Sequence, residues 1–285
     1  MHPHTSLDLA DIVRKLGNPS QPDQQAQAVQ SLLELCVELE ASQALVVVAV
    51  AGAIPPLLQL LRSDSRDKVL SMAAALLAIL AVDADNAVTI AAAGAIPPLV
   101  QLLRSGSMRK VQTMAAGALR NLAGKDDTEN AVAIAAAGAI PLLVQLLAPG
   151  LPALAHENAT GALWRLAMID ENKIAIAAAG AIPPLVQLLG PEYPAEVQQG
   201  AAGALTILAV NTENQATIGA AGATPQLVQL VGPGSCADVR QAAAGALGNL
   251  SDHAVNSRMI ASCADAIPRL VQLLGPAGSQ EQQQR

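Results

Sequence analysis

The ten residues GAIPPLVQLL at positions 94–103, followed by AAGALRNLA at 115–123, decide the fold of this chain. The first string, or a near copy of it, occurs six times in the 285 residues, and its proline recurs every 42 to 44 residues. This spacing is typical of repeats built from two or three helices. The copies begin at Gly52, Gly94, Gly138, Gly180, Gly222 and Asp265. The sequence therefore predicts an all-α solenoid, in which each repeat buries its apolar face against its neighbours.

Local chemistry divides each repeat into three helices. An Asn stands eleven or twelve residues before the proline, usually after Asp, Glu or Thr, and it predicts the start of a first helix. The glycine ends this helix because it adopts positive φ without strain, and the proline three residues later opens a short second helix. The third helix is the longest, because apolar residues over 111–123 recur at spacings of three and four. The five asparagines are Asn86, Asn130, Asn172, Asn214 and Asn256.

We predict one solenoid over residues 1–274, followed by a disordered polar tail over 275–285. A partial repeat with only the second and third helices is expected at 1–37, and another with only the first and second helices at 255–274. The five full repeats between them are expected at 38–82, 83–126, 127–170, 171–212 and 213–254. The last partial repeat leaves apolar residues near Ile267, Leu270 and Leu273 without a third helix to cover them, which predicts self-association.

Composition limits the classes of function. Hydrophobic residues make up 52% of the chain and aromatic residues 1%, which favours closely packed helices with small side chains. A formal net charge of −7 disfavours nucleic acid as a partner. Apolar stretches are broken by glycine and proline well before the roughly 20 residues that span a bilayer, so no membrane insertion is expected. Three cysteines without a pairing pattern favour a cytoplasmic protein, and they are compatible with an additional nuclear location.

Catalytic motifs do not stand out in the sequence. The four histidines are His2, His4, His156 and His253, and none accompanies a nucleophile or a metal-binding spacing. The glycines recur at the helix junctions, so their positions need no bound phosphate as an explanation. We therefore expect no enzymatic activity, no cofactor and no metal.

The combination of GAIPPLVQLL and AAGALRNLA resembles the armadillo repeat family over about residues 8–274. The Gly before Ala-Leu and the Leu-x-Asn-Leu ending are more similar to β-catenin-like, vacuolar-adaptor-like and plant U-box-associated armadillo proteins than to importin-α. The resemblance implies a right-handed superhelix of three-helix units. It also implies that the third helices line a concave groove, which holds partner segments in extended form.

This resemblance makes a non-catalytic scaffold or adaptor the expected function, with an extended or helical segment of a partner protein held in the groove. One alternative is the substrate-recognition part of a ubiquitin ligase, although this chain contains no U-box. A less favoured alternative is an adaptor for nuclear import. In importin-type repeats a third-helix Trp helps to form the peptide pocket, whereas the same position here holds Ala75, Gly117, Gly161, Gly203 and Gly245.

Candidate partner-binding residues lie on the third helices, on the side turned away from the expected core. Amide side chains can pair with the backbone of a strand-like ligand, Arg can bind carboxylates or carbonyls, and Trp is a frequent anchor. We expect the main contact patch at Arg120, Asn121, Trp164 and Arg165. The four third-helix glycines are expected to leave the groove floor bare. The full set of candidates is Lys110, Thr113, Arg120, Asn121, Glu157, Trp164, Arg165, Gln199, Thr206, Gln241 and Asn249.

Overall fold

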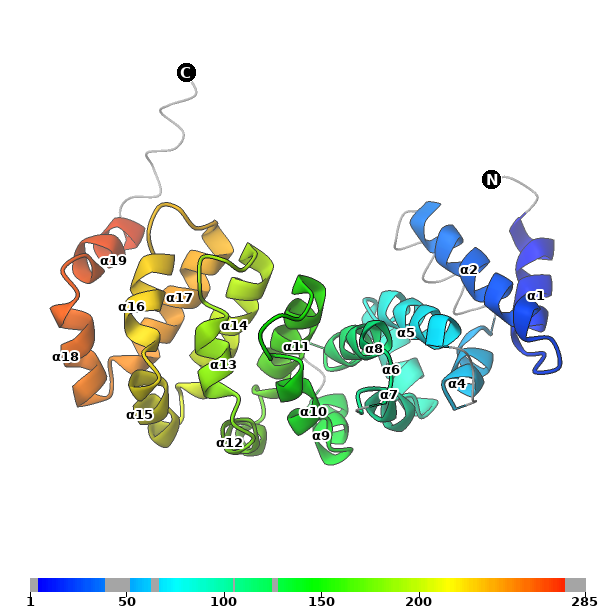
Figure 1. Cartoon of the computed structure of the whole chain (residues 1–285), viewed down its shortest axis with the longest axis horizontal. Coiled ribbons are helices and arrows are strands. Elements are labelled where there is room, and N and C mark those ends of the chain that lie inside the picture. Colours follow the sequence, from blue (N-terminus) through cyan, green and yellow to red (C-terminus); the bar gives the residue numbers. More distant parts are fainter. Residues whose placement is uncertain (1–4, 39–51, 63–66, 105, 125–127, 275–285) are drawn as a thin grey trace, which may run out of the picture. The chain divides into compact units, whose positions relative to one another are not determined.

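The structure is a computed structural model that describes residues 5–38, 52–62, 67–104, 106–124 and 128–274 (Figure 1). These residues form α-helices joined by turns, with no β-strand among them, which confirms the predicted all-α class. Residues 39–51, where the first helix of the repeat at 38–82 is expected, lie outside the described residues. The predicted disordered tail, 275–285, lies outside them as well.

Three kinds of helix recur in the predicted order. The first helices are α6 (Ala84–Ala92), α9 (Thr128–Ala136), α12 (Asp170–Ala178), α15 (Thr212–Ala220) and α18 (Ala254–Ser262). The second helices are α1 (Thr5–Leu16), α4 (Ile54–Arg62), α7 (Ile96–Leu102), α10 (Ala139–Gln145), α13 (Ile182–Gln187), α16 (Ala223–Leu230) and α19 (Ala266–Leu274). The third helices are α2 (Pro22–Glu38), α5 (Asp67–Leu80), α8 (Arg109–Leu122), α11 (Ala153–Leu166), α14 (Ala195–Leu208) and α17 (Ala237–Leu250).

The chain divides into two compact units, Met1–Asn172 and Lys173–Arg285. Within the first unit the third helices pack in sequence order, α2 against α5, α5 against α8, and α8 against α11. Within the second unit α14 packs against α17. Each unit is therefore a stack of helical repeats, which is the architecture of an α-solenoid.

The core of each unit lies along the third helices. In the first unit Leu77, Leu119 and Leu163 occupy equivalent positions and are 0% exposed. In the second unit Leu205 and Leu247 take the same positions and are also buried. These residues lie on the face that the spacing of three and four predicts, so hydrophobic burial between successive third helices accounts for the stacking.

A glycine with positive φ makes the bend between the first and second helices. The φ of Gly138 is 83°, and the equivalent Gly222 has a φ of 81°. A residue with a Cβ is strained in this left-handed region, whereas glycine is not. Pro97 and Pro183 then occupy the first turn of their second helices, where the missing N–H removes no hydrogen bond. The junction predicted from the sequence is confirmed.

The first helices begin two residues before the recurrent asparagine, so the predicted start is corrected. Helix α6 is capped by Asp83, whose carboxylate accepts a hydrogen bond from the backbone N–H of Asn86. Helix α15 is capped by Asn211, whose side-chain oxygen accepts from the backbone N–H of Glu213 and Asn214. The capping residue therefore precedes the asparagine that the sequence suggested.

In three repeats the recurrent asparagine instead joins the third helix to the following first helix. The side-chain amide of Asn130 donates to the carbonyl of Leu122 at 3.1 Å, and Asn214 donates to Leu208 at the same distance. Asn172 makes the equivalent bond to Leu166 at 3.0 Å. All three asparagines are buried. Each bond satisfies a carbonyl in the last turn of a helix, which has no partner inside that helix.

No single described helix is both long and apolar enough to cross a membrane. Among the described helices only α9 and α10, taken together, have the length and composition of a span, and this pair is bent by 80°.

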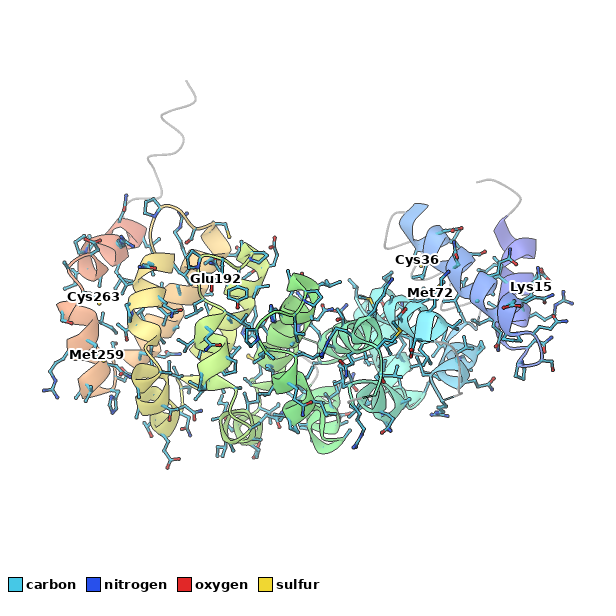
Figure 2. All side chains as sticks on the ribbon, viewed as in Figure 1. Lys15, Cys36, Met72, Glu192, Met259 and Cys263 are labelled. Atoms are coloured by element: carbon cyan, nitrogen blue, oxygen red, sulfur yellow. The ribbon has the colours of Figure 1, made fainter. Side chains whose placement is uncertain are left out.

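None of the three cysteines forms a disulfide; Cys36 lies on α2 and Cys263 follows α18 (Figure 2). Burial raises the pKa of the Cys36 thiol, which keeps it in its less reactive protonated form.

One buried hydroxyl group lacks a hydrogen-bond partner within the described residues. Thr224 occupies the position that holds Ile in the neighbouring repeats; it is 0% exposed and its Oγ1 is unpaired. Replacing Thr224 with the isosteric Val should therefore raise the free energy of unfolding by about 1 kcal/mol, because it removes an unsatisfied polar group. Chemical denaturation measures this change.

Thr160→Val is the matched control for that prediction. Thr160 is also 0% exposed, but its hydroxyl lies 2.8 Å from the carbonyl of His156. Its replacement should leave stability unchanged or lower it, because a hydrogen bond is lost. If Thr224→Val is no more stable than the unmodified protein, the account of Thr224 is wrong.

Candidate functional site

The two asparagines predicted to face a ligand both bind the preceding third helix. Asn121 on α8 donates its side-chain amide to the carbonyl of Ala78 on α5, at 2.8 Å. Asn249 on α17 donates in the same way to Thr206 on α14, also at 2.8 Å. Each bond joins residues 43 positions apart, so it is a repeating contact between neighbouring repeats. The side-chain oxygen of each Asn keeps its capacity to accept a hydrogen bond.

Two threonines that were predicted to contact a partner instead take part in the packing between repeats. Thr113 is 4% exposed, its hydroxyl donates to Arg109, and its carbonyl accepts from the side chain of Asn158 on α11. Burial removes the Thr113 side chain from any surface that a ligand could touch. Thr206 is half-buried, and its hydroxyl lies 2.9 Å from the carbonyl of Ala242 on α17.

Three of the four third-helix glycines lie against side chains of a neighbouring repeat, which corrects the expectation of a bare groove floor at these positions. A Cβ added at Gly117 would lie 2.9 Å from the side-chain amide of Asn158. At Gly161 a Cβ would lie 2.6 Å from Arg120 Nε, and at Gly245 it would lie 3.1 Å from a methyl group of Thr206. These glycines therefore make room for side chains from an adjacent repeat.

Arg120 and Glu157 form an ion pair between α8 and α11. Arg120 Nη1 lies 2.8 Å from Glu157 Oε1, and both side chains are 31% exposed. Arg120 passes over Gly161 to reach this carboxylate. Because solvent screens the pair, its contribution to stability is about 0 to 1 kcal/mol. The pair fixes the direction of the Arg120 guanidinium and neutralises its charge.

Arg165 lies near this pair without a carboxylate of its own among the described residues. It is half-buried at the end of α11, and no hydrogen bond or ion pair to its guanidinium occurs in the described part of the chain. Burial lowers the pKa of Arg165, and the positive charge of Arg120 lowers it further. Both effects disfavour an isolated cation at this position, so an anionic group that bound here would relieve them.

The remaining candidates make no hydrogen bond among the described residues. Lys110 and Gln241 are exposed on α8 and α17. Gln199 and Trp164 are half-buried on α14 and α11. These four side chains are therefore available for contact with another molecule, whereas Asn121, Thr206 and Asn249 also serve repeat packing.

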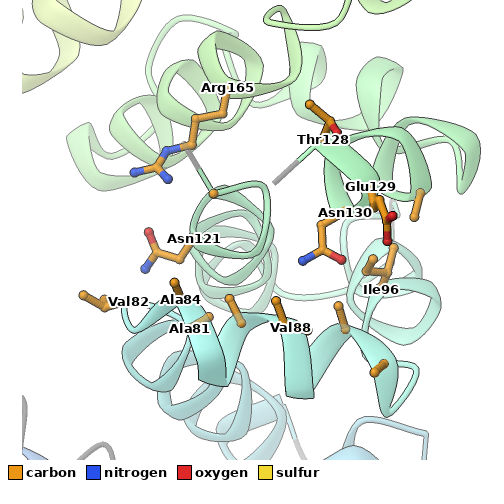
Figure 3. Close-up of a pocket in the computed structure, with 15 residues that line it drawn as sticks. Ala81, Val82, Ala84, Val88, Ile96, Asn121, Thr128, Glu129, Asn130 and Arg165 are labelled. Atoms are coloured by element: carbon orange, nitrogen blue, oxygen red, sulfur yellow. The ribbon is translucent and has the colours of Figure 1, made fainter. Parts of the chain in front are cut away.

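A cleft of about 970 Å³ opens beside the end of α8 in the first unit. We name it the first-helix cleft, because most of its lining comes from α6 and α9. Figure 3 shows Asn121, Arg165 and Val82 at one end and Thr128, Glu129 and Ile96 at the other. The lining residues are Ala81, Val82, Ala84, Ala87, Val88, Ala91, Ala92, Ile96, Asn121, Gly124, Thr128, Glu129, Asn130, Ala133 and Arg165.

The chemistry of this cleft suits binding. Its walls are mainly alanine and valine, and its polar groups gather at the two ends. Within the described residues, no group of three or more His, Cys, Asp or Glu side chains is placed to hold a metal ion. An apolar cleft with a few polar groups that fix orientation is the usual form of a ligand site.

Comparison with known proteins identifies the family. The model of the Armadillo/beta-catenin-like repeat matches residues 83–124, 127–168, 170–210 and 211–252. These four ranges make up more than half of the chain, so the protein belongs to the armadillo repeat family. None of the curated proteins matches the chain in sequence.

Several solved structures are similar to this chain. An engineered protein from the Northeast Structural Genomics Consortium is 34% identical with a TM-score of 0.75, and the match covers 86% of this chain and 99% of that one. The designed armadillo repeat protein YIII(Dq)4CqI is 30% identical with a TM-score of 0.74, over 85% and 99% of the two chains. The designed armadillo repeat protein YIII(Dq.V1)4CPAF, solved in complex with the peptide (KR)4, is 29% identical with a TM-score of 0.70, over the same shares.

Sequence reasoning missed the polar contacts between repeats and the first-helix cleft. Asn158, Gln215 and Asn256 are buried and bind carbonyls at least 34 residues away. The recurrence of Asn in each repeat was visible in the sequence, but its position suggested only a helix start. The cleft gave no signal, because Ala and Val on a first helix have the same pattern whether they are covered or exposed.

Because Asn121 bonds to Ala78, its replacement should lower the stability of the protein. Replacing a residue that only binds a ligand would leave stability unchanged. Asn121→Ala should lower the free energy of unfolding by about 1 kcal/mol, because one hydrogen bond between repeats is lost. Denaturant unfolding of the whole chain measures it. Lys110→Ala, an exposed change on the same helix, is the control and should have no effect. Equal stability of the two variants would contradict the structural role of Asn121.

Proposed function

We propose that this protein is a non-catalytic scaffold that binds a segment of a partner protein on the third-helix surface of its repeats. Membership of the armadillo family supports this proposal, as does the similarity to a designed armadillo repeat protein that was solved in complex with a peptide. Two points stay predictions from the sequence. One is the closer likeness to β-catenin-like, vacuolar-adaptor-like and plant U-box-associated repeats, and the other is the cytoplasmic location.

The observation that carries the proposal is the pair Trp164 and Arg165 on α11. Both are half-buried, and neither makes a hydrogen bond to another described residue. A Trp with exposed surface supplies a large, rigid contact area, and Arg supplies several donors in a fixed geometry. Such residues are the frequent anchors of protein interfaces. The pair is therefore the centre of the proposed contact surface.

Charge on this surface disfavours a basic ligand in the first unit. Arg120 and Arg165 lie near each other, and among the described residues Glu157 is the one carboxylate that pairs with either of them. The local charge is therefore positive, whereas a Lys- and Arg-rich peptide requires acidic or amide groups. A positive surface is unfavourable for nuclear import, in which the cargo signal is basic, and it favours a scaffold for other segments.

Selection of binders from a random peptide library tests the proposal. Peptides recovered with the full chain should bind at least about tenfold more weakly to a Trp164→Ala, Arg165→Ala double variant, because the two anchors are removed. The control is Arg104→Ala with Gln145→Ala, which removes two exposed side chains outside the third helices and should bind as the unmodified protein does. Recovery of no peptide, or equal binding by both double variants, would contradict the proposal.

An apolar surface on α19 supports a second proposal, that two copies of the chain associate. Ile267 is 57% exposed, Val271 is 59% exposed and Leu273 is 39% exposed. Ile267 and Val271 are one helical turn apart and share one exposed face of α19, whereas Leu273 lies on another side of the helix. Exposed apolar faces of this kind are typical of association sites. The proposed occupant is the same face of a second copy, because two such faces would cover each other.

Sedimentation equilibrium tests this association. The unmodified chain should show a mass that rises with concentration, whereas Ile267→Asp with Val271→Asp should remain monomeric, because charge on this face opposes its burial. The exposed changes Val88→Asp and Val132→Asp on the first unit serve as the control and should leave association intact. A monomer at all concentrations would overturn the proposal.

A further inference from the structure

The first-helix cleft exposes apolar surface that the packing of the repeats does not use. Val82 is 68% exposed and Val88 is 56% exposed. Both line the cleft, together with Ile96 at its far end. Exposed aliphatic side chains that gather in one concave place are more informative than single ones scattered over a surface.

The alanines on both walls of the cleft determine the size of the ligand side chains that fit into it. Ala84, Ala91 and Ala92 come from α6, and Ala133 comes from α9. Methyl groups leave the two helices accessible to side chains of intermediate size, such as Val and Leu. A volume of about 970 Å³ accommodates several such side chains, in keeping with the size of known ligand sites.

Polar groups with opposite hydrogen-bonding roles lie at one end of the cleft. Arg165 offers donors and has no carboxylate partner in the described part of the chain. Asn121 uses its Nδ2 for Ala78 and so presents its side-chain oxygen as an acceptor. Figure 3 shows both side chains at the same end of the cleft as Val82. This arrangement complements a peptide that carries a side-chain carboxylate. The carboxylate accepts hydrogen bonds from Arg165, and a neighbouring backbone N–H of the peptide donates to the side-chain oxygen of Asn121.

We propose that the first-helix cleft binds a partner segment in which an acidic residue is flanked by aliphatic residues. The carboxylate binds Arg165, a backbone N–H donates to Asn121, and the aliphatic side chains lie along α6 and α9 next to Val88. This inference rests on the proposed function, because it names the chemistry of a segment that the scaffold holds. It also extends the contact surface beyond the third helices to the first helices.

The charges around the cleft favour this occupant over a basic peptide or a nucleic acid. The guanidinium of Arg165 and that of Arg120 repel each other, and Glu157 pairs with Arg120. Glu129, the carboxylate in the described lining, lies at the opposite end of the cleft from Arg165. A ligand carboxylate at the Arg165 end therefore balances the positive charge there. A nucleic acid requires an array of cations along its backbone, whereas Arg165 is the one cationic residue among the described residues that line the cleft.

Titration of the full chain with three synthetic peptides tests the inference. The probe is acetyl-GVAVDVAVG-amide, which has aliphatic residues on both sides of Asp, and its counterparts carry Asn or Lys in place of Asp. The unmodified protein should bind the Asp peptide about tenfold more tightly than the Asn peptide, and the Lys peptide most weakly, because a charge-assisted hydrogen bond to Arg165 is lost.

Variants of the cleft separate its two recognition elements. Arg165→Gln should abolish the difference between the Asp and Asn peptides, and Arg165→Glu should reverse the order of the Asp and Lys peptides. Ala133→Phe should weaken all three peptides, because the exposed Ala133 lines the cleft and a larger side chain fills it. The controls are Val132→Phe, an exposed neighbour on α9 outside the lining, and Arg258→Gln on α18; both should bind as the unmodified protein does.

The outcomes are distinguishable from failure of the proposed function. Binding of the Asp peptide no tighter than that of the Asn peptide, or no binding of the Asp peptide at millimolar concentration, overturns this inference. The same holds if Arg165→Gln leaves the preference for Asp unchanged. If the random library nevertheless yields peptides that require Trp164, the scaffold function stands and only the acidic–aliphatic specificity and its location fail.

Discussion

Burial of small apolar faces between successive third helices is the constraint on which the rest of the structure depends. Leu77, Leu119 and Leu163 take equivalent places on α5, α8 and α11, and all are removed from solvent. A single repeat offers no cover for such a face, so each repeat is stable only beside another. The near absence of aromatic residues follows from this arrangement, because Ala and Gly allow helices to approach closely.

Polar contacts then set the register of the stack. Asn121 and Asn249 bind carbonyls on the preceding third helix, and buried asparagines such as Asn130 join the third helix to the next first helix. Burying an amide without a partner would be unfavourable, so these residues tolerate only the register in which their bonds form. The side-chain N–H groups of Asn121 and Asn249 thus serve packing, whereas Trp164 and Arg165 on α11 make no hydrogen bond to other described residues.

The sequence predicted the fold well because its main signals are local and repeated. The positive φ of Gly138, the first-turn prolines and the apolar face of α8 each depend on neighbouring residues, and six copies of one pattern confirm each other. The site was harder to predict. Whether Arg120 faces a ligand or Glu157 depends on residues 37 positions apart, and whether Gly161 lies bare depends on Arg120. Such facts follow from the packing of two helices and not from either helix alone.

Hydrogen exchange on the Leu119→Ala variant tests the dependence of one repeat on the next most directly. The substitution removes buried methyl groups from α8 and should destabilise it by about 2 to 5 kcal/mol. The account predicts that protection falls first in α8 and in its contact helices α5 and α11, while α17 in the second unit keeps its protection longest. An equal loss of protection in every helix would contradict it, because that result would indicate a single cooperative core instead of a stack of mutually dependent repeats.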